Sequence, residues 1–141
     1  MDSNLRREII LEHYQDPVHK GLHDDSSYLK INTRSDSCID NLDFMLKVND
    51  NNIIEDICFD GEACAISTSA SSIIIKNLLG KNVEEARVLL DNYQKMIEEK
   101  DYDKELLGEL IVYDEIGKQP NRINCALLPK RAVMDLLDQI K

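Results

Sequence analysis

The hydrophobic pattern of the chain changes its period at Gly61, and this change constrains the fold more than any other feature. Over residues 42–48 apolar side chains alternate with the residues between them, as in a strand with one buried face. Residues 49–52 have the composition of a turn, so residues 53–60 are predicted to return as a second strand. After Gly61 the apolar residues recur every three or four positions, which is typical of helices. Strands followed by helices indicate an α+β fold.

The rest of the chain extends this prediction. A helix capped by Ser3 should end before Pro17, and a weak strand should follow. Asn82 and Glu85 resemble a capping box that opens a helix, and Pro129 suits the first position of the last helix. We therefore expect a single α+β domain over residues 1–141: a three-stranded antiparallel sheet with an N-terminal helix and a helical C-terminal half packed on one face. The expected helices cover residues 3–14, 65–79, 82–97, 103–111 and 129–140, the weak strand covers 28–33, and 112–121 are expected to be irregular.

Charge and hydropathy exclude two classes of partner. The chain has 27 acidic and 17 basic residues and a net charge of −10, so most of its surface would repel DNA or RNA. No apolar run approaches the ~18 residues that a membrane span needs. The first ten residues lack the apolar core of a signal peptide. We expect a cytoplasmic protein that binds neither nucleic acid nor membrane.

The four cysteines are the first place to look for chemistry, because thiols in a reducing cytosol are more often metal ligands or nucleophiles than disulfides. Cys38, Cys64 and Cys125 each fall at a boundary between predicted elements, where side chains can converge at one end of a domain. Cys58 lies within the returning strand and points away from its apolar face. We therefore predict that Cys58 takes no part in the site. The three histidines are spaced irregularly and are not predicted ligands.

Asp40 follows Cys38 by two residues and adds a carboxylate to the three thiols. Such a set suits tetrahedral zinc, and its oxygen ligand would exchange more easily than sulfur. The spacing of these cysteines matches no generic zinc finger, so ordinary core cysteines explain it equally well. Arg122, close to Cys125, either orients the aspartate or steadies a departing thiolate, or is an ordinary surface residue.

Three stretches in the same order resemble the NifU-like scaffold family over nearly the whole chain. They are residues 37–40 (SCID), residues 59–71 (FDGEACAISTSAS) and residues 122–129 (RINCALLP), with a further similarity in residues 13–21. Asn124 stands directly before the last cysteine, where the IscU type has histidine, and residues 100–119 form an additional stretch before that cysteine. Both features resemble the SufU type. Ile39, Ala63 and Lys130 depart from the family pattern.

The resemblance implies iron–sulfur cluster assembly, with a metal held by Cys38, Asp40, Cys64 and Cys125. It implies a zinc-dependent sulfurtransferase that takes persulfide sulfur from a cysteine desulfurase of the SufS type and passes it to a downstream scaffold. Cys38 is the expected sulfur acceptor, because its loop is the least constrained of the ligand positions. Two alternatives stay open, a scaffold that builds a 2Fe–2S cluster on the same residues and a structural zinc module that binds a partner.

Overall fold

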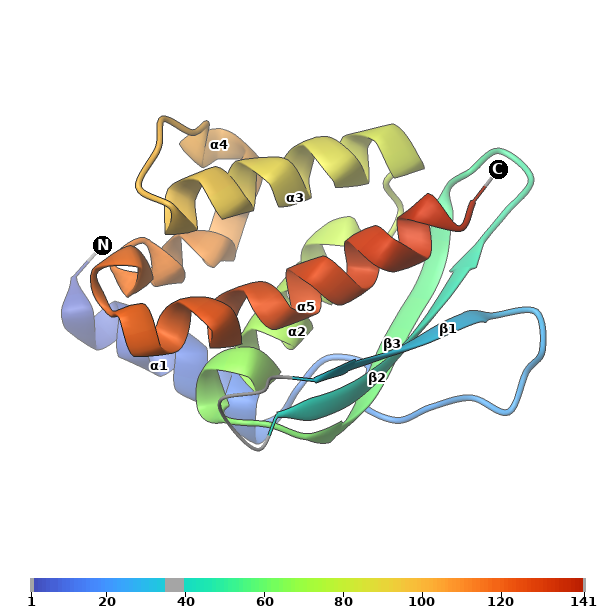
Figure 1. Cartoon of the computed structure of the whole chain (residues 1–141), viewed down its shortest axis with the longest axis horizontal. Helices are drawn as coiled ribbons and strands as arrows, with labels where there is room; N and C mark the ends of the chain where they lie inside the picture. The colour runs from blue at the N-terminus through green and yellow to red at the C-terminus, as the bar shows by residue number, and fades with distance from the viewer. Residues whose placement is uncertain (1, 35–39, 141) are drawn as a thin grey trace.

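A computed structural model describes residues 2–34 and 40–140 of the chain, and it confirms the α+β fold (Figure 1). The expected three strands and the N-terminal helix are present, and the C-terminal half is helical. The elements are α1 Ser3–Gln15, β1 Leu29–Arg34, β2 Asn41–Val48, β3 Ile54–Glu62, α2 Ala65–Leu78, α3 Val83–Ile97, α4 Lys104–Leu107, the 3-10 helices η1 Gly108–Tyr113 and η2 Ile116–Lys118, and α5 Pro120–Asp138.

The sheet is an antiparallel meander in the order β1-β2-β3. Phe44 of β2 lies opposite Phe59 of β3, and the two rings stack with their centroids 5.7 Å apart. This pair belongs to the buried core, which places the alternating apolar residues of both strands on one face. At one end of the sheet Asn41 lies opposite Glu62, so the residues just before β2 lie beside those just after β3.

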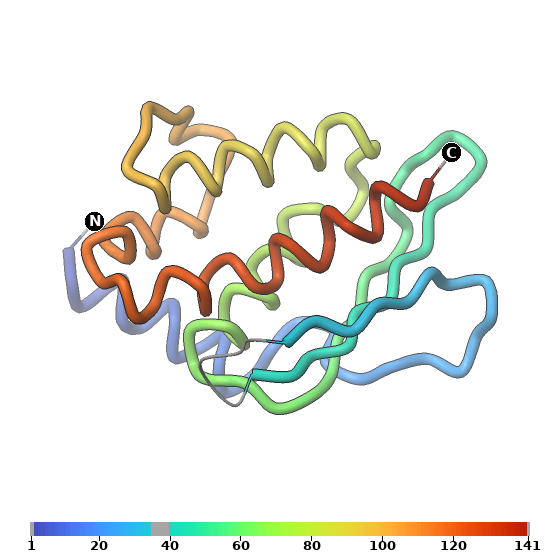
Figure 2. The backbone as a smooth tube through the Cα atoms, in the orientation of Figure 1, coloured from blue at the N-terminus to red at the C-terminus, as the bar shows by residue number. Residues whose placement is uncertain are grey.

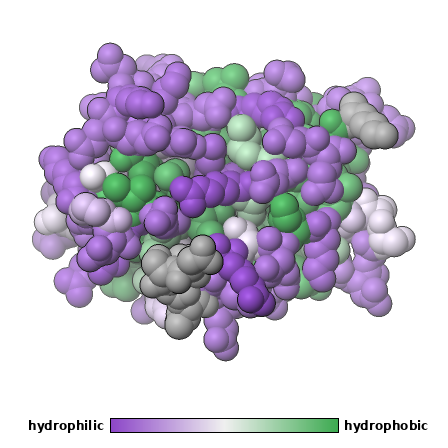
Figure 3. Space-filling model, in the orientation of Figure 1, coloured by the Kyte–Doolittle hydropathy of each residue, from purple (hydrophilic) through white to green (hydrophobic). Residues whose placement is uncertain are grey.

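The helices cover the apolar face of this sheet. Helix α5 crosses the sheet against β1 and β2 and also packs on α2 and α3 (Figures 1 and 2). Helix α2 is buried over most of its length because α1 packs on one side of it and α5 on another. The outer surface in this view is mostly hydrophilic (Figure 3). Within the described residues, no helix is long and apolar enough to cross a membrane.

The N-cap residues of α3 and α1 can be compared with the sequence prediction. Asn82 caps α3 and Glu85 bonds back to it, as the sequence predicts, so the capping box is confirmed. At α1 the cap is Asp2, whose Oδ1 accepts from the Leu5 N–H at 2.8 Å, and the prediction of Ser3 was wrong. One helix was predicted over residues 103–111, but the chain forms the short helix α4 there, followed by the 3-10 helix η1.

The last helix begins nine residues earlier than predicted, at Pro120, and Pro129 lies inside it. A proline within a helix removes one N–H donor, that of the hydrogen bond to the carbonyl four residues before. Here that carbonyl belongs to Cys125, and it accepts a hydrogen bond from the Ser67 hydroxyl at 2.9 Å. A side chain from α2 thus replaces the missing donor, and α5 continues through Pro129. Cys125 consequently lies within α5 and not ahead of it.

Candidate metal centre

Three of the predicted site residues meet at the end of the sheet where β2 begins. A carboxylate oxygen of Asp40 and the sulfur atoms of Cys64 and Cys125 all lie within 4.8 Å of one another. Asp40 directly precedes β2 and Cys64 follows β3, so the pairing of these strands brings the two together. Helix α5 crosses above them and contributes Cys125. Cys38, the fourth predicted ligand, lies outside the described residues, as does Ile39.

The Asp40 carboxylate is held in place by its neighbours. The residue is only 2% exposed, and a buried carboxylate needs hydrogen-bond donors or a cation to offset its lost hydration. Its Oδ1 accepts from the main-chain N–H of Cys64 at 2.7 Å, and its Oδ2 accepts from the Ser67 hydroxyl at 2.6 Å. Both oxygens are therefore hydrogen-bonded, which offsets the cost of burying the charge.

Cys64 is the N-cap of α2, in extended backbone with φ −67° and ψ 170°. Its sulfur accepts from the Ser67 N–H at 3.5 Å, so it takes the place that a serine or aspartate oxygen usually has in such a cap. The Cys125 residue is 9% exposed, and its main-chain carbonyl bonds Ser67 as described above.

One edge of this group, from the Cys64 sulfur to the Asp40 carboxylate, fits a tetrahedral metal. The sulfur of Cys64 lies 3.7 Å from Oδ2 of Asp40. Zinc–sulfur bonds of about 2.3 Å and zinc–oxygen bonds of about 2.0–2.2 Å give a sulfur–oxygen edge of roughly 3.5–3.7 Å in a tetrahedron. Two thiolates and a carboxylate would supply three ligands of a four-coordinate site, and these donor types suit zinc or iron.

Cys58 lies away from this group. It is next to Phe59 in β3, and its side chain is on the other face of the sheet. It lines a hollow together with His19, His23 and Asp56. Burial, reinforced by the charge of Asp56, raises the pKa of the Cys58 thiol, which makes it a poor nucleophile at neutral pH. His19 Nδ1 lies 2.9 Å from Asp56 Oδ1, and His23 Nε2 lies 3.3 Å from Asp56 Oδ2. These histidines pair with a strand carboxylate, and the metal-binding group found among the described residues includes neither of them.

Arg122 and Lys130 flank Cys125 on α5. Arg122 is exposed in the first turn of α5, whereas Cys64 and Ser67 donate to the Asp40 carboxylate. Lys130 Nζ donates to the side chain of Gln94 on α3. The Lys130 side chain therefore joins two helices. Ser67 was not predicted as a site residue, although its position three residues after a cysteine at a helix N-cap marks it as a neighbour of the site.

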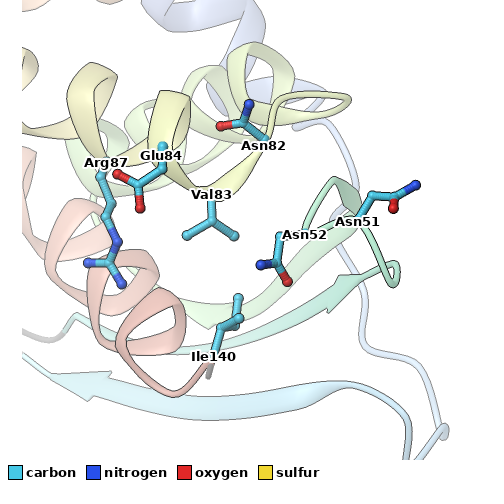
Figure 4. A pocket seen from close by; sticks show the side chains of 7 residues that line it. All are labelled: Asn51, Asn52, Asn82, Val83, Glu84, Arg87 and Ile140. Carbon is cyan, nitrogen blue, oxygen red and sulfur yellow. The ribbon is translucent and has the colours of Figure 1, made fainter.

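A separate hollow lies at the opposite end of the sheet, beside the β2–β3 turn (Figure 4). The first N–H of α3, that of Val83, donates to the Asn52 carbonyl, and Arg87 is paired with Asp138 at 2.6 Å. Its described lining residues include one carboxylate, that of Glu84, and no thiol or imidazole, so they form no cluster of metal ligands. The lining residues are Asn51, Asn52, Asn82, Val83, Glu84, Arg87 and Ile140.

Comparisons with known proteins agree with this fold. Residues 5–126 match the model of the NifU-like N-terminal domain. The zinc-dependent sulfurtransferase SufU of Bacillus subtilis is 33% identical over 130 residues, which cover 92% of this chain and 86% of the relative. The iron–sulfur cluster assembly scaffold protein IscU of Thermotoga maritima is 27% identical over 133 residues, covering 94% and 92% of the two chains.

A solved structure is also similar. The putative iron–sulfur cluster assembly scaffold protein for the SUF system from Fervidobacterium islandicum superposes with a TM-score of 0.84 at 25% identity, covering 96% of this chain and 99% of that one. The family match covers well over half of the chain, and the structural match extends over nearly all of it. The chain therefore belongs to the NifU-like N-terminal domain family.

Proposed function

We propose that the chain is a zinc-dependent sulfur acceptor in iron–sulfur cluster assembly. It takes persulfide sulfur from a cysteine desulfurase of the SufS type in the cytoplasm and passes it to a downstream scaffold. The observation that carries the proposal is the convergence of the Asp40 carboxylate with the Cys64 and Cys125 sulfur atoms. The similarity to a relative named a zinc-dependent sulfurtransferase supports the choice of metal and reaction.

Cys38, Asp40, Cys64 and Cys125 would hold the metal. Bound zinc keeps cysteine ligands deprotonated at neutral pH, so a ligand that leaves it is already a thiolate. Cys64 is fixed by the first turn of α2, and Cys125 lies within α5. Asp40 supplies the harder oxygen ligand, which exchanges more readily than sulfur. We assign Cys38 as the nucleophile, because it precedes β2 and belongs to neither helix.

The transfer step is a thiol–disulfide-type exchange. The Cys38 thiolate attacks the outer sulfur of the partner's persulfide, and a new sulfur–sulfur bond forms. The bond between that sulfur and the partner's cysteine breaks, and its electron pair leaves on the partner's thiolate. No oxidant or reductant is consumed. We assign Arg122, exposed beside the site, to steadying the charge of the departing thiolate.

The test is a desulfurase assay with zinc-loaded protein. Desulfurase turnover should rise when the chain is added, and mass spectrometry should find one extra sulfur on Cys38. Cys38→Ser should abolish both effects, whereas Cys58→Ser is the matched control and should keep both. A chain that binds zinc but neither accelerates the desulfurase nor gains sulfur would be a structural zinc module, and the proposal would fall.

A second candidate function is a scaffold that builds a 2Fe–2S cluster on the same four residues. The similarity to relatives named IscU scaffolds favours it. Anaerobic reconstitution with iron and sulfide separates the two functions. A scaffold would give a brown protein that transfers an intact cluster to an apo-acceptor, whereas the sulfur acceptor would keep zinc and form no transferable cluster.

A further inference from the structure

Ser67 contacts all three described residues of the metal centre. Its hydroxyl oxygen lies 2.6 Å from Asp40 Oδ2, 2.9 Å from the main-chain oxygen of Cys125 and 3.6 Å from the sulfur of Cys64. The side chain is completely buried, so water does not compete for its hydrogen bond. These three contacts come from the segment before β2, from α5 and from the start of α2. Ser67 therefore lies at the junction of the elements that build the site.

The Ser67 hydroxyl has one hydrogen and faces two acceptors. The carboxylate oxygen is the nearer and, being charged, the stronger acceptor of the two. The Cys125 carbonyl is available to a side-chain donor because Pro129, four residues further along α5, has no N–H. The hydroxyl can consequently turn from one acceptor to the other without leaving its hydrogen unbonded.

Oδ2 of Asp40 is also the oxygen placed to bind a metal, since it lies 3.7 Å from the sulfur of Cys64. The Ser67 hydroxyl and a metal ion would therefore compete for the same oxygen. We propose that Ser67 is the positioning residue that makes Asp40 an exchangeable ligand. This inference rests on the proposed metal-binding function and concerns how readily that site releases one ligand.

The physical argument compares the two states of the carboxylate. When Asp40 is detached from the metal, the Ser67 hydroxyl donates to Oδ2 and offsets the cost of a buried charge. When Oδ2 binds the metal, its charge is shared, and the hydroxyl turns to the Cys125 carbonyl. Ser67 thus stabilises the detached state more than the bound state. Without the hydroxyl, detachment costs more and Asp40 stays on the metal.

The test is the rate of zinc release from Ser67→Ala, measured with a chromophoric chelator, together with zinc affinity by competition. Release should slow about tenfold and affinity should rise by a similar factor, the reverse of the roughly 10–100-fold loss that removing an outer-shell group usually causes. Ser69→Ala is the matched control. Ser69 is equally buried on α2, and among the described residues its hydroxyl bonds the Ile66 carbonyl and the Tyr113 hydroxyl and none of Asp40, Cys64 and Cys125.

A double-mutant cycle with Asp40→Ala makes the test specific. Once the carboxylate is absent, Ser67→Ala should no longer change zinc release. The absorption spectrum of the cobalt-substituted protein gives a readout independent of activity, and it should change in Ser67→Ala but not in Ser69→Ala. An unchanged or weaker zinc affinity in Ser67→Ala, or an equal effect in the control, would overturn the inference alone. A wild-type chain that binds no metal would instead overturn the proposed function and this inference together.

Discussion

Gly61 of β3 packs against Asn41, the residue that follows Asp40 of the candidate metal centre. Its replacement by alanine tests whether this close packing positions Asp40. The φ of Gly61 is +135°, which side chains rarely adopt, and a Cβ built there would lie 2.2 Å from the Asn41 carbonyl oxygen. Gly61→Ala therefore has two costs. Strained backbone at positive φ costs about 1–3 kcal/mol, and forcing an extra carbon into packed backbone costs about 1–3 kcal/mol. We expect the free energy of unfolding to fall by roughly 2–6 kcal/mol, the sum of these two ranges.

Gly21→Ala is the matched control, because Gly21 has a similar φ of +126° but no atom within 4 Å of its Cβ position. It should show only the backbone strain, about 1–3 kcal/mol. Urea unfolding of both metal-free variants, followed by far-UV circular dichroism, measures both losses. The difference between them isolates the contact with Asn41. Equal destabilisation of the two variants would refute the argument from close approach.

The same two variants should also differ in their affinity for zinc. Relief of the contact must move the backbone at Asn41, and Asn41 is directly bonded to Asp40. Gly61→Ala should therefore weaken zinc binding, since a metal site tolerates little displacement of a ligand. Gly21→Ala should bind zinc as the wild type does. Competition with a chromophoric chelator measures both affinities, and normal affinity in Gly61→Ala would show that β3 does not position the carboxylate.

Three further predictions concern the ligands themselves. Elemental analysis should find one zinc per chain in the wild type and in Cys58→Ser, and a loss of zinc in Cys64→Ser and Cys125→Ser; zinc loss in the Cys58 variant would contradict the assignment. Zinc removal should increase hydrogen exchange around the candidate ligands more than in β2 and β3, because the metal joins segments far apart in sequence; an equal increase throughout would argue against this. Asp40→Ala should retain zinc, completed by a water, but accept sulfur slowly from the desulfurase, and wild-type turnover would remove Asp40 from the mechanism.

The local sequence pattern determined much of the fold. Alternation along β2 and β3 gave the hairpin and its buried face, because strand side chains alternate between faces whatever lies nearby. The Asn82 and Glu85 capping box gave the start of α3, because its bonds lie within a single turn. The resemblance over four short stretches, three of them specific in their order, identified the family and the candidate ligands.

Only the tertiary structure decided where the last helix begins and how the site is held together. Proline is compatible both with a first helical position and with an interior position, so the sequence could not choose between Pro120 and Pro129. The choice is made by the packing of α2 against α5, which places the Ser67 hydroxyl 2.9 Å from the Cys125 carbonyl, to which Pro129 can offer no N–H. Ser67 and Cys125 lie 58 residues apart in the chain. A hydrogen bond across that separation leaves no local pattern, and the folded packing of α2 against α5 creates it.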